Sequence, residues 1–397
     1  MTVVLTLMVR DEADIIAAML EHHLAHGVDH ILVTDNGSVD GTREILADYA
    51  RVAPLTVFDD PVHRKQQSEV VTRMARLAAT EHGADWVING DADEFLRPVD
   101  PGLSLAEVFQ QLPAAVGSFQ VPVVNLVGPF ARQGSGIRRL THRDLRTEEQ
   151  LQAAGLIAHP TSNAIHIGDP DVEVVQGNHG VSTPAGVEPP AELALEVLHL
   201  PWRSMEQIER KTRNMGEGYD ANPELRPSPR HHGMRDWRRM RAGLLTAFVA
   251  WRMPALDELH GPEYRADASL AASLTQLAGV VPDRLAAALE DSADEPFDDA
   301  FLHAERARAA AAEPLERLAL DELTNARLDA DALRVDRDSL SAQLQGTRAH
   351  ADCLQRDLDQ AHAEIEQLHA RVSMLERSPS QRLAGVARRA IGRLGGS

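Results

Sequence analysis

The sequence is short of two residue types that often reveal chemistry: it has one cysteine, Cys353, and two lysines, Lys65 and Lys211. A single cysteine excludes a framework of intrachain disulfides and suits a reducing compartment. Aromatic residues are also scarce, at 4%, although an apolar fraction of 43% is that of a globular protein. No run of 18 apolar residues occurs, so a membrane-spanning helix is not expected.

Basic residues are fewer than acidic ones, so the formal net charge is −20. A soluble acidic protein is expected, and general nucleic-acid binding is disfavoured, since such a surface repels a phosphate backbone. The opening segment "MTVVLTLMVRDEADII" lacks the basic region, the long apolar run and the small-residue cleavage site of a signal peptide. The cytoplasm is therefore the expected location.

What the sequence does contain is an alternation of strand and helix signals over residues 1–100. Short apolar runs rich in β-branched residues occur at 2–9, 30–34, 55–58 and 85–88. Segments with helical spacing separate them. Buried strands separated by helices predict an α/β fold with a mostly parallel sheet and right-handed crossovers. Ligands of such folds bind at the carboxyl ends of the strands, where "TDNGS" and "NGDADEF" lie.

The stretch "DWVINGDADEFLRP" (85–98) crowds four acidic side chains around a short apolar run. Asp91 and Asp93 are separated by one small residue, so in an extended segment both carboxylates point to one side and can face one cation. Oxygen ligands that leave coordination positions open suit Mg²⁺ or Mn²⁺, which also takes waters and substrate phosphates. A diphosphate-bearing substrate would be bound through this metal, which neutralises charge on the departing diphosphate.

Three blocks of sequence, in this order, resemble the family-2-type bacterial glycosyltransferases of the GT-A fold: "VLTLMVRDEADIIAAMLEHHLAHGVDHILVTDNGSVDGTREIL", "DWVINGDADEFL" and "LHLPWRSMEQIERKTRNMGEGYDAN". The second block is similar to the branch whose metal motif reads D-A-D-E-F. The third is similar to that branch's H-x-P-x-R-S-x-x-Q-x-x-x-K segment. The resemblance covers roughly residues 1–225. It is specific for fold and reaction class and does not define the sugar or the acceptor.

The resemblance implies roles for individual acidic residues. Asp35, in "TDNGS", would contact the nucleotide base or ribose, Asp91 the ribose and metal, and Asp93 the metal and diphosphate. Glu94 would contact the acceptor or orient its neighbours. Two of these residues also have a purely structural interpretation: Asp35 as a turn former in "DNGS", and Glu94 as a cap of the following turn.

The resemblance also implies roles for imidazole and basic groups. His199 would be a third metal ligand, and a packed, hydrogen-bonded histidine is the alternative. Four basic residues would bind the phosphates of the donor: Arg64, Lys65, Arg203 and Lys211. For the last two an exposed helix face is the alternative. Asp11 departs from the family, which often has asparagine there, and it places another acid near the site.

No motif identifies the catalytic base of the family in this sequence. An inverting transfer, the expected outcome, needs a carboxylate within hydrogen-bond reach of the acceptor hydroxyl. Spacing after the D-x-D motif directs attention to "GDPDVEVVQGNHG", which contains Asp169, Asp171, Glu173 and His179. Asp171 and Glu173 are the candidates carried forward, beside Glu94. A transfer with retention would need no such base.

Four segments are expected along the chain: a GT-A-type domain (1–225), a helical extension with an acidic linker (226–300), a coiled coil (315–377) and a basic amphipathic tail (378–397). The coiled coil is predicted by a seam of mostly apolar residues that alternate three and four apart for over seven repeats, from Leu323 to Leu375. Self-association is favoured, and a helix folded onto its own protein is the alternative.

Two polar residues in the seam, Arg337 and Thr347, should weaken it or fix its register. Cys353 lies beside the seam, so an interchain disulfide is not expected. The final segment "RLAGVARRAIGRLGGS" has one apolar face, several arginines and no acid, which indicates contact with an anionic membrane surface. A frayed tail, or a helix docked on its own protein, is the alternative.

The expected function is metal-dependent transfer of a sugar from a nucleotide-diphosphate sugar to an acceptor hydroxyl, in surface polysaccharide or glycolipid synthesis. A sugar nucleotidyltransferase is one alternative, disfavoured because "LMVRDEADII" lacks the glycine-rich phosphate loop that such enzymes place after the first strand. No P-loop or dinucleotide fingerprint occurs either. The alternative from another class is an inactive GT-A-like scaffold that its coiled coil oligomerises.

Overall fold

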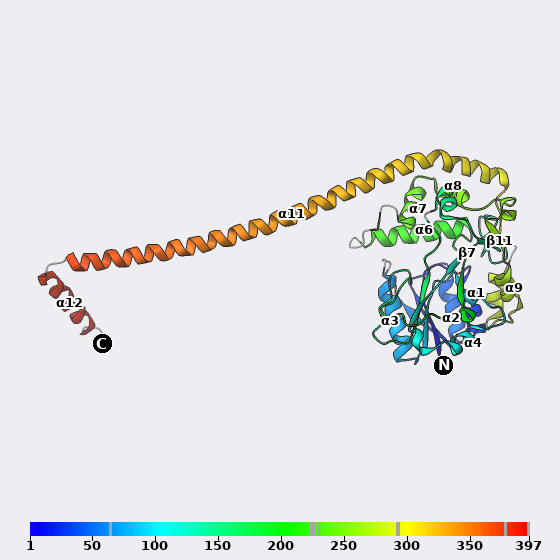
Figure 1. The fold of residues 1–397 in the computed structure, drawn as a ribbon, viewed down its shortest axis with the longest axis horizontal. Coiled ribbons are helices and arrows are strands. Elements are labelled where there is room, and N and C mark those ends of the chain that lie inside the picture. The colour runs from blue at the N-terminus through cyan, green and yellow to red at the C-terminus, as the bar shows by residue number, and fades with distance from the viewer. Residues whose placement is uncertain are drawn as a thin grey trace. The chain divides into compact units, whose positions relative to one another are not determined.

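The computed structural model describes residues 1–62, 66–156, 158–222, 227–228, 231–290, 294–376 and 379–394. The chain divides into a first unit, Met1–Leu320, and a second unit, Asp321–Ser397 (Figure 1). The candidate site lies in the first unit, and the expected coiled coil lies almost wholly in the second.

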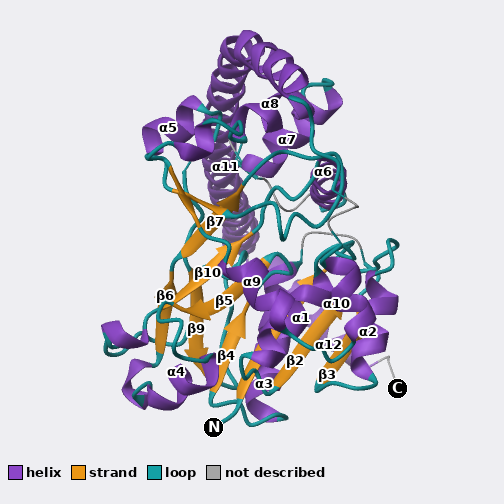
Figure 2. Cartoon of the chain, turned by 90° about the vertical axis from the view of Figure 1, so that its right-hand side faces the viewer, coloured by secondary structure: helices purple, strands orange, loops and turns teal. Residues whose placement is uncertain are grey.

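A six-stranded sheet forms the centre of the first unit, in the order β3-β2-β1-β4-β9-β6 (Figure 2). Its strands are β1 (Val3–Val9), β2 (His30–Asp35), β3 (Leu55–Asp59), β4 (Trp86–Asn89), β6 (Ser118–Val121) and β9 (Asn163–Ile167). The strands from β3 to β4 are parallel, whereas β9 is antiparallel to both of its neighbours. The predicted α/β class and its parallel sheet of four strands are confirmed.

Three helices connect the parallel strands: α1 (Ile16–Ala25), α2 (Thr42–Ala50) and α3 (Gln67–Thr80). The apolar side chains of β1 are almost completely buried on both faces, as expected of a central strand of a parallel sheet covered by helices. α1 is buried from Ile16 to His23 because it also packs against α10 (Pro282–Ala288). The buried set includes three polar residues, Glu21, His22 and His23, beside the apolar ones.

A second, five-stranded sheet has the order β11-β8-β7-β10-β5. Its strands are β5 (Glu94–Pro98), β7 (Val123–Val127), β8 (His142–Asp144), β10 (Leu195–His199) and β11 (Tyr264–Ala266). β10 is antiparallel to β5 and parallel to β7, and this register sets His199 opposite both Glu94 and Asn125. Sequence analysis did not predict this second sheet, because its pairings join segments that are distant in the sequence.

The first unit contains further helices outside the parallel strands and their connections. They are α4 (Leu105–Gln111), α5 (Glu148–Ala153), α6 (Met205–Asp220), α7 (His232–Arg241), α8 (Leu245–Arg252) and α9 (Ser269–Gln276), with short 3-10 turns η1 (Ala114–Val116), η2 (Ala191–Leu193) and η3 (Glu258–His260). α6 begins after Ser204, whose hydroxyl accepts a hydrogen bond from the amide of Gln207 at 3.2 Å. This cap fixes the start of the helix that faces the site.

The long helix α11 (Asp299–Glu376) begins in the first unit, where Leu302, Ala309 and Leu320 are buried. Its first turns are fixed there by Arg239 of α7, which donates two hydrogen bonds to Glu316 at 2.7 and 2.8 Å. In the second unit, α11 continues to Glu376 and is followed by α12 (Pro379–Leu394). None of the helices in the described part of the chain is long and apolar enough to cross a membrane.

Candidate functional site

A cleft of about 210 Å³ opens at the carboxyl ends of β1, β2 and β4. β1 lies between β2 and β4, so the chain reverses its direction of travel across the sheet there, which is where open α/β sheets bind ligands. The side chains and backbone that line it come from the strand ends, the start of α3 and one face of α6: Met8, Val9, Arg10, Glu12, Asn36, Gln66, Gln67, Asp91, Ala92, Asp93, Lys211, Asn214, Met215 and Gly218.

The contribution of α6 follows from helix geometry. Lys211, Asn214, Met215 and Gly218 are spaced by three or four residues, so they form one stripe on the helix that faces the cleft. Gly218 leaves that stripe without a side chain at its end. The stripe therefore presents one ammonium group, one amide and one thioether toward the acidic loop between β4 and β5.

The carboxylate of Asp93 is buried and surrounded by positive groups. Its Oδ2 lies 2.7 Å from the Nζ of Lys211, 3.4 Å from the Nη1 of Arg203 and 3.7 Å from the Nε2 of His199. Burial alone would raise the pKa of Asp93, but Lys211, His199 and Arg203 together hold it well below its usual range. Asp93 is therefore ionised at neutral pH. Two cations, Lys211 of α6 and Arg203 of the turn between β10 and α6, therefore meet the acids of this loop.

Arg203 does not line the cleft and has no exposed surface. Its Nε donates a hydrogen bond to Asp14 at 2.7 Å, and Nη2 bonds to Glu12. Burial would lower the pKa of Arg203, but these carboxylates and Asp93 raise it above its usual value. Arg203 thus joins the loop after β1 to the loop after β4. It was predicted to bind the diphosphate, and the structure instead shows it engaged by three carboxylates.

Glu12 does line the cleft, and sequence analysis did not single it out. Its side chain is 13% exposed, and burial together with the nearby Asp93 raises its pKa to about 7, although Arg203 opposes the shift. The signal that could have found it is the same one that drew attention to Asp91 and Asp93, namely acidic residues directly after a buried strand.

Asp91 is half-buried in the cleft, where two amide groups contact it. Its Oδ1 accepts hydrogen bonds from Gln67 at 2.9 Å and from Asn178 at 3.3 Å. Gln67 starts α3 and lines the cleft, whereas Asn178 belongs to the segment that was searched for a base. No local pattern distinguished either amide, because glutamine and asparagine are common surface residues.

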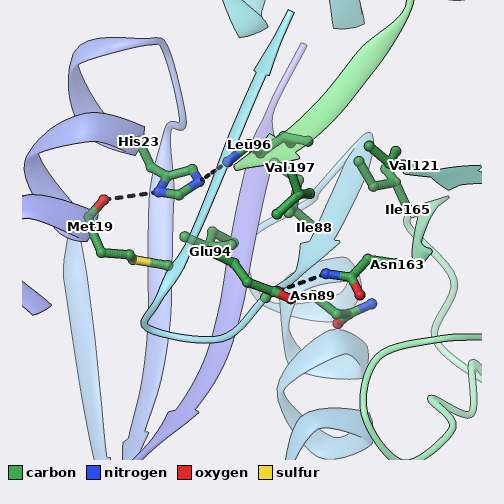
Figure 3. Close-up of a pocket in the computed structure, with 12 residues that line it drawn as sticks. Met19, His23, Ile88, Asn89, Glu94, Leu96, Val121, Asn163, Ile165 and Val197 are labelled. Carbon is green, nitrogen blue, oxygen red and sulfur yellow. Dashed lines mark hydrogen bonds between the residues drawn. The ribbon is translucent and has the colours of Figure 1, made fainter. Parts of the chain in front are cut away.

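Glu94 is the third acid of the loop, and it is held in a different state. Its Oε2 accepts a hydrogen bond from the backbone amide of Asp91 at 3.1 Å. It accepts a second one from Asn163 at 2.7 Å (Figure 3). Burial and the charges of Asp91 and Asp93 raise the pKa of Glu94 well above its usual range. The protonated form is therefore favoured. A cavity of about 10 Å³ beside it has room for about one water.

His199 was predicted to be a metal ligand with Asp91 and Asp93. Its Nδ1 lies 2.9 Å from the Oδ1 of Asn125, and its Nε2 faces Asp93. A hydrogen bond of this kind fixes the ring and leaves the other nitrogen directed at the carboxylate. Even so, within the ranges that the structure describes, no three histidine, cysteine or acidic side chains come together as a ready cation-binding cluster.

Asp35 is fully buried and does not line the cleft. Its Oδ1 accepts from the amide of Ser38 at 3.1 Å, and its Oδ2 accepts from Arg43 at 3.0 Å. These contacts are those of the turn-forming alternative. The next residue, Asn36, lines the cleft, and its amide group donates to the carbonyls of Asp60 and Val62, both at 2.8 Å.

Asp11 has a left-handed backbone, with φ of 57°. Asparagine and aspartate tolerate this conformation better than other residues with a side chain. Its carboxylate accepts hydrogen bonds from the amide of Val39 and from Asn214, both at 2.8 Å. Asp11 therefore connects the loops after β1 and β2 to α6.

The two remaining base candidates, Asp171 and Glu173, are exposed and lie outside the cleft. Their segment packs on α3, where Arg76 donates a hydrogen bond to the carbonyl of Val172 at 2.8 Å. The structure therefore does not bring these two carboxylates to the site. Arg64 and Lys65, which were predicted to approach the phosphates, lie outside the described residues. Arg10 lines the cleft and is a basic residue that sequence analysis did not single out.

Among known protein families, one family model matches the part of the chain that contains the loop between β4 and β5. The model of Glycosyltransferase family 92 matches residues 2–127, which contain β1, β2, β4 and both Asp91 and Asp93. No curated protein sequence matches the chain.

Solved structures resemble the chain only weakly. The structure of S. aureus TarS 1-349 is 11% identical, covering 74% of this chain and 91% of that one with a TM-score of 0.32. TarS in complex with UDP-GlcNAc is 13% identical, covering 77% and 88%, with a TM-score of 0.33. Glucosyl-3-phosphoglycerate synthase from Mycobacterium tuberculosis, in complex with Mn2+, UDP and glucosyl-3-phosphoglycerate, is 17% identical, covering 42% and 56%, with a TM-score of 0.24. Scores this low carry no functional conclusion.

Proposed function

We propose that the protein is a glycosyltransferase that binds a nucleotide-diphosphate sugar in the cleft and transfers the sugar to an acceptor hydroxyl. The observation that carries the proposal is the position of Asp91 and Asp93. Both line a cleft at the carboxyl ends of β1 and β4, within the segment that matches the Glycosyltransferase family 92 model. The proposal implies that the domain that carries the cleft has a GT-A-type nucleotide-sugar-binding fold.

The side chains around the cleft fit a divalent cation in one respect and are incomplete in another. Asp91 and Asp93 are oxygen ligands on one loop, and an ammonium group already lies 2.7 Å from Asp93, so the position accepts positive charge. A third acidic or imidazole ligand is not clustered with them among the described residues. This set suits Mn²⁺ or Mg²⁺ that also takes waters and donor phosphates. The ion would supply neutralisation of the leaving diphosphate.

Cationic side chains of the protein would bind the diphosphate beside the metal ion. Lys211 and Arg10 both line the cleft and can donate charge-assisted hydrogen bonds to phosphate oxygens. Arg203 acts behind them as a positioning residue, because it holds Glu12 and Asp93 in place without lining the cleft. Asn36, Gln66 and Gln67 offer amide groups for the nucleoside.

If the transfer inverts configuration, Glu12 is a stronger candidate for the base than Asp171 or Glu173. Glu12 lines the cleft, and its pKa of about 7 is close to that of an efficient general base at neutral pH. Glu12→Gln should then abolish turnover while Asp171→Asn and Glu173→Gln leave it intact. Loss of turnover in Asp171→Asn or Glu173→Gln, but not in Glu12→Gln, would instead assign the base to the exposed segment. NMR of the product anomer would give the stereochemical outcome.

We place the acceptor among growing surface glycans and lipid-linked saccharides because α12 offers a way to reach a membrane. α12 contains Arg388 and Arg389, and its Leu383 and Val386 are 72% and 63% exposed. Such a helix binds anionic lipid at the interface. Sedimentation with vesicles of anionic lipid should be lost when the chain is cut after Ser378. Equal sedimentation of the two forms would remove the membrane from the proposal.

A panel of uridine, guanosine and thymidine diphosphate sugars, each with and without Mn²⁺, tests the proposal. Metal-dependent release of the nucleoside diphosphate, increased by a saccharide acceptor, is the expected result. Formation of a sugar nucleotide from a sugar phosphate and a nucleoside triphosphate would instead identify a nucleotidyltransferase. No turnover and no metal-dependent nucleotide binding across the panel would identify an inactive scaffold.

A further inference from the structure

In the second unit, α11 carries a row of large apolar side chains that no described residue of its own chain covers. Every residue from 328 to 376 is exposed. Along the seam, Leu333 is 68% exposed, Leu354 is 55% exposed and Leu375 is 66% exposed. A helix with so many exposed leucines in one row is stable in water only if another helix covers the row.

The spacing of this row identifies the kind of helix that can cover it. When each repeat of seven is lettered a to g, Leu323 is a first a position and the seam falls on a and d as far as Leu375. Strict alternation of three and four is the pattern of a two-helix seam with knobs-into-holes packing. Ala326, Ala330, Ala351 and Ala361 also lie in the seam, and these small residues allow two helices to approach closely.

The charges beside the seam identify the partner and its direction. In a parallel pair, each g residue meets the e residue five positions later on the other helix. Five such pairs combine an acid with a base or a histidine: Glu322–Arg327, Asp329–Arg334, Asp357–His362, Glu364–His369 and Arg371–Glu376. The other three pairs are Asp336–Ser341, Gln343–Arg348 and His350–Gln355, and none of the eight joins like charges.

An antiparallel pair of the same helices is less favourable. With the seam fully overlapped, g residues meet g residues. The g residue nearest Asp336 is then Glu364, and only the pair of Asp329 with Arg371 joins opposite charges. Like charges directly opposite one another destabilise such a pair. The complementarity is therefore a property of two identical helices in parallel register.

We propose that residues 322–376 form a parallel, in-register, two-stranded coiled coil with a second copy of this chain. Arg337 then lies beside its own copy in the seam, flanked on the same helix by Asp336 and Asp338. The structure shows Arg337 donating to Asp338 at 2.9 Å, so acids beside the seam partly neutralise it. A polar seam position of this kind lowers stability and fixes the register.

Two alanines two positions apart give a matched test in the full-length chain. In a Cys353→Ser background, Ala361→Cys places its thiol in the seam at d, and Ala363→Cys places it on the outer face at f. Under mild oxidation, Ala361→Cys should become a disulfide-linked dimer on a non-reducing gel, while Ala363→Cys should remain largely monomeric. An antiparallel pair would separate the two copies of position 361 by about 36 Å and give no cross-link.

Cross-linking of neither variant, or of both at equal rates, would overturn the proposal. Light scattering of the unmodified chain should give the mass of a dimer, and the mass of a monomer or trimer would also overturn it. These outcomes are independent of enzymatic activity, so they do not depend on the glycosyltransferase proposal.

The direction of the pair has a second test in its charges. Arg334→Glu sets an acid against Asp329 of the partner subunit and should weaken the dimer roughly five- to tenfold. It also removes the intrachain ion pair of Arg334 with Asp331. Asp329→Arg combined with Arg334→Glu restores the interchain pair but not the intrachain one, and should recover the wild-type dimer dissociation constant. No recovery in the double variant would contradict the parallel register.

Discussion

The Nζ of Lys211 lies 2.7 Å from the Oδ2 of Asp93, although α6 supplies the first residue and the loop between β4 and β5 supplies the second. Burial would lower the pKa of Lys211, but Asp93 and Glu12 raise it above its usual value. The site therefore contains a fixed cation at the place where the D-x-D motif predicts a metal. A divalent ion that binds Asp93 has to share it with, or displace, this ammonium group, which is then free to meet a phosphate.

Lys211→Met tests both consequences of this contact. Donor affinity should fall about 10- to 100-fold, because a charge-assisted hydrogen bond to phosphate is lost. Binding of Mn²⁺ without nucleotide, followed by electron paramagnetic resonance, should become tighter, because the competing ammonium group is gone. Arg213→Met removes an exposed cation from the same helix and should change neither quantity. Unchanged donor affinity in Lys211→Met would remove Lys211 from the diphosphate site.

Arg203→Met should lower the free energy of unfolding of the first unit by about 3–5 kcal/mol, because Glu12, Asp14 and Asp93 lose a shared buried partner. Urea unfolding followed by tryptophan fluorescence reports on this unit, since it contains every tryptophan of the chain: Trp86, Trp202, Trp237 and Trp251. Arg213→Met again serves as the exposed control. A loss in Arg203→Met no larger than in the control would contradict the positioning role.

Glu94→Gln should keep turnover within a few-fold of wild type. Burial and the charges of Asp91 and Asp93 raise the pKa of Glu94 and so favour its protonated form, which glutamine resembles in shape and charge. Glu94→Ala should be more harmful, since the amides of Asp91 and Asn163 lose their acceptor. Loss of turnover in Glu94→Gln as severe as in Glu94→Ala would show that Glu94 works as a carboxylate, in the acceptor or base role.

His23 should make the first unit sensitive to acid. It is buried on α1, and burial lowers its pKa to about 4, so the folded state keeps it neutral while the unfolded chain protonates it below about pH 6.5. Because its folded pKa is depressed, stability is lost as the pH falls through this window. Between pH 7.5 and pH 5 the loss from this residue should be about 2 kcal/mol.

His23→Gln cannot take up that proton, so the dependence of the urea midpoint on pH should be shallower in the variant by the same amount. Other titrating groups, including the neighbouring His22, are common to both proteins, and their contributions largely cancel in the comparison. Identical pH dependence of wild type and variant would contradict the burial of a neutral imidazole at this position.

The local pattern of the sequence was enough to predict the parallel strands of the first sheet and the sheet edge at which the cleft lies. Strand and helix periodicities are short-range signals, and the carboxyl ends of parallel strands necessarily share one edge. That is why Asp91 and Asp93 could be predicted to lie at this edge, whereas Lys211, in another block of sequence, was predicted to join them only through the family resemblance.

The partners of those residues could not be predicted in the same way. Whether Arg203 faces solvent or three carboxylates depends on the pairing of β10 with β5 and on the burial of the loops, which no local pattern encodes. The charge states differ for the same reason: Asp93 is ionised beside cations, and Glu94, one residue later, favours its protonated form. Gln67 and Asn178 are ordinary amides until the fold sets them against Asp91.

Asp93→Asn is the most direct test of the account, since it removes one charge and keeps the shape of a side chain that touches Lys211 and Arg203. Turnover with the best donor of the nucleotide-sugar panel and binding of Mn²⁺ would be measured on the same preparation, after its folded state is checked by tryptophan fluorescence. The account predicts that turnover falls by at least about 100-fold and that Mn²⁺ binding weakens with it. Wild-type turnover together with wild-type Mn²⁺ affinity in this variant would contradict it.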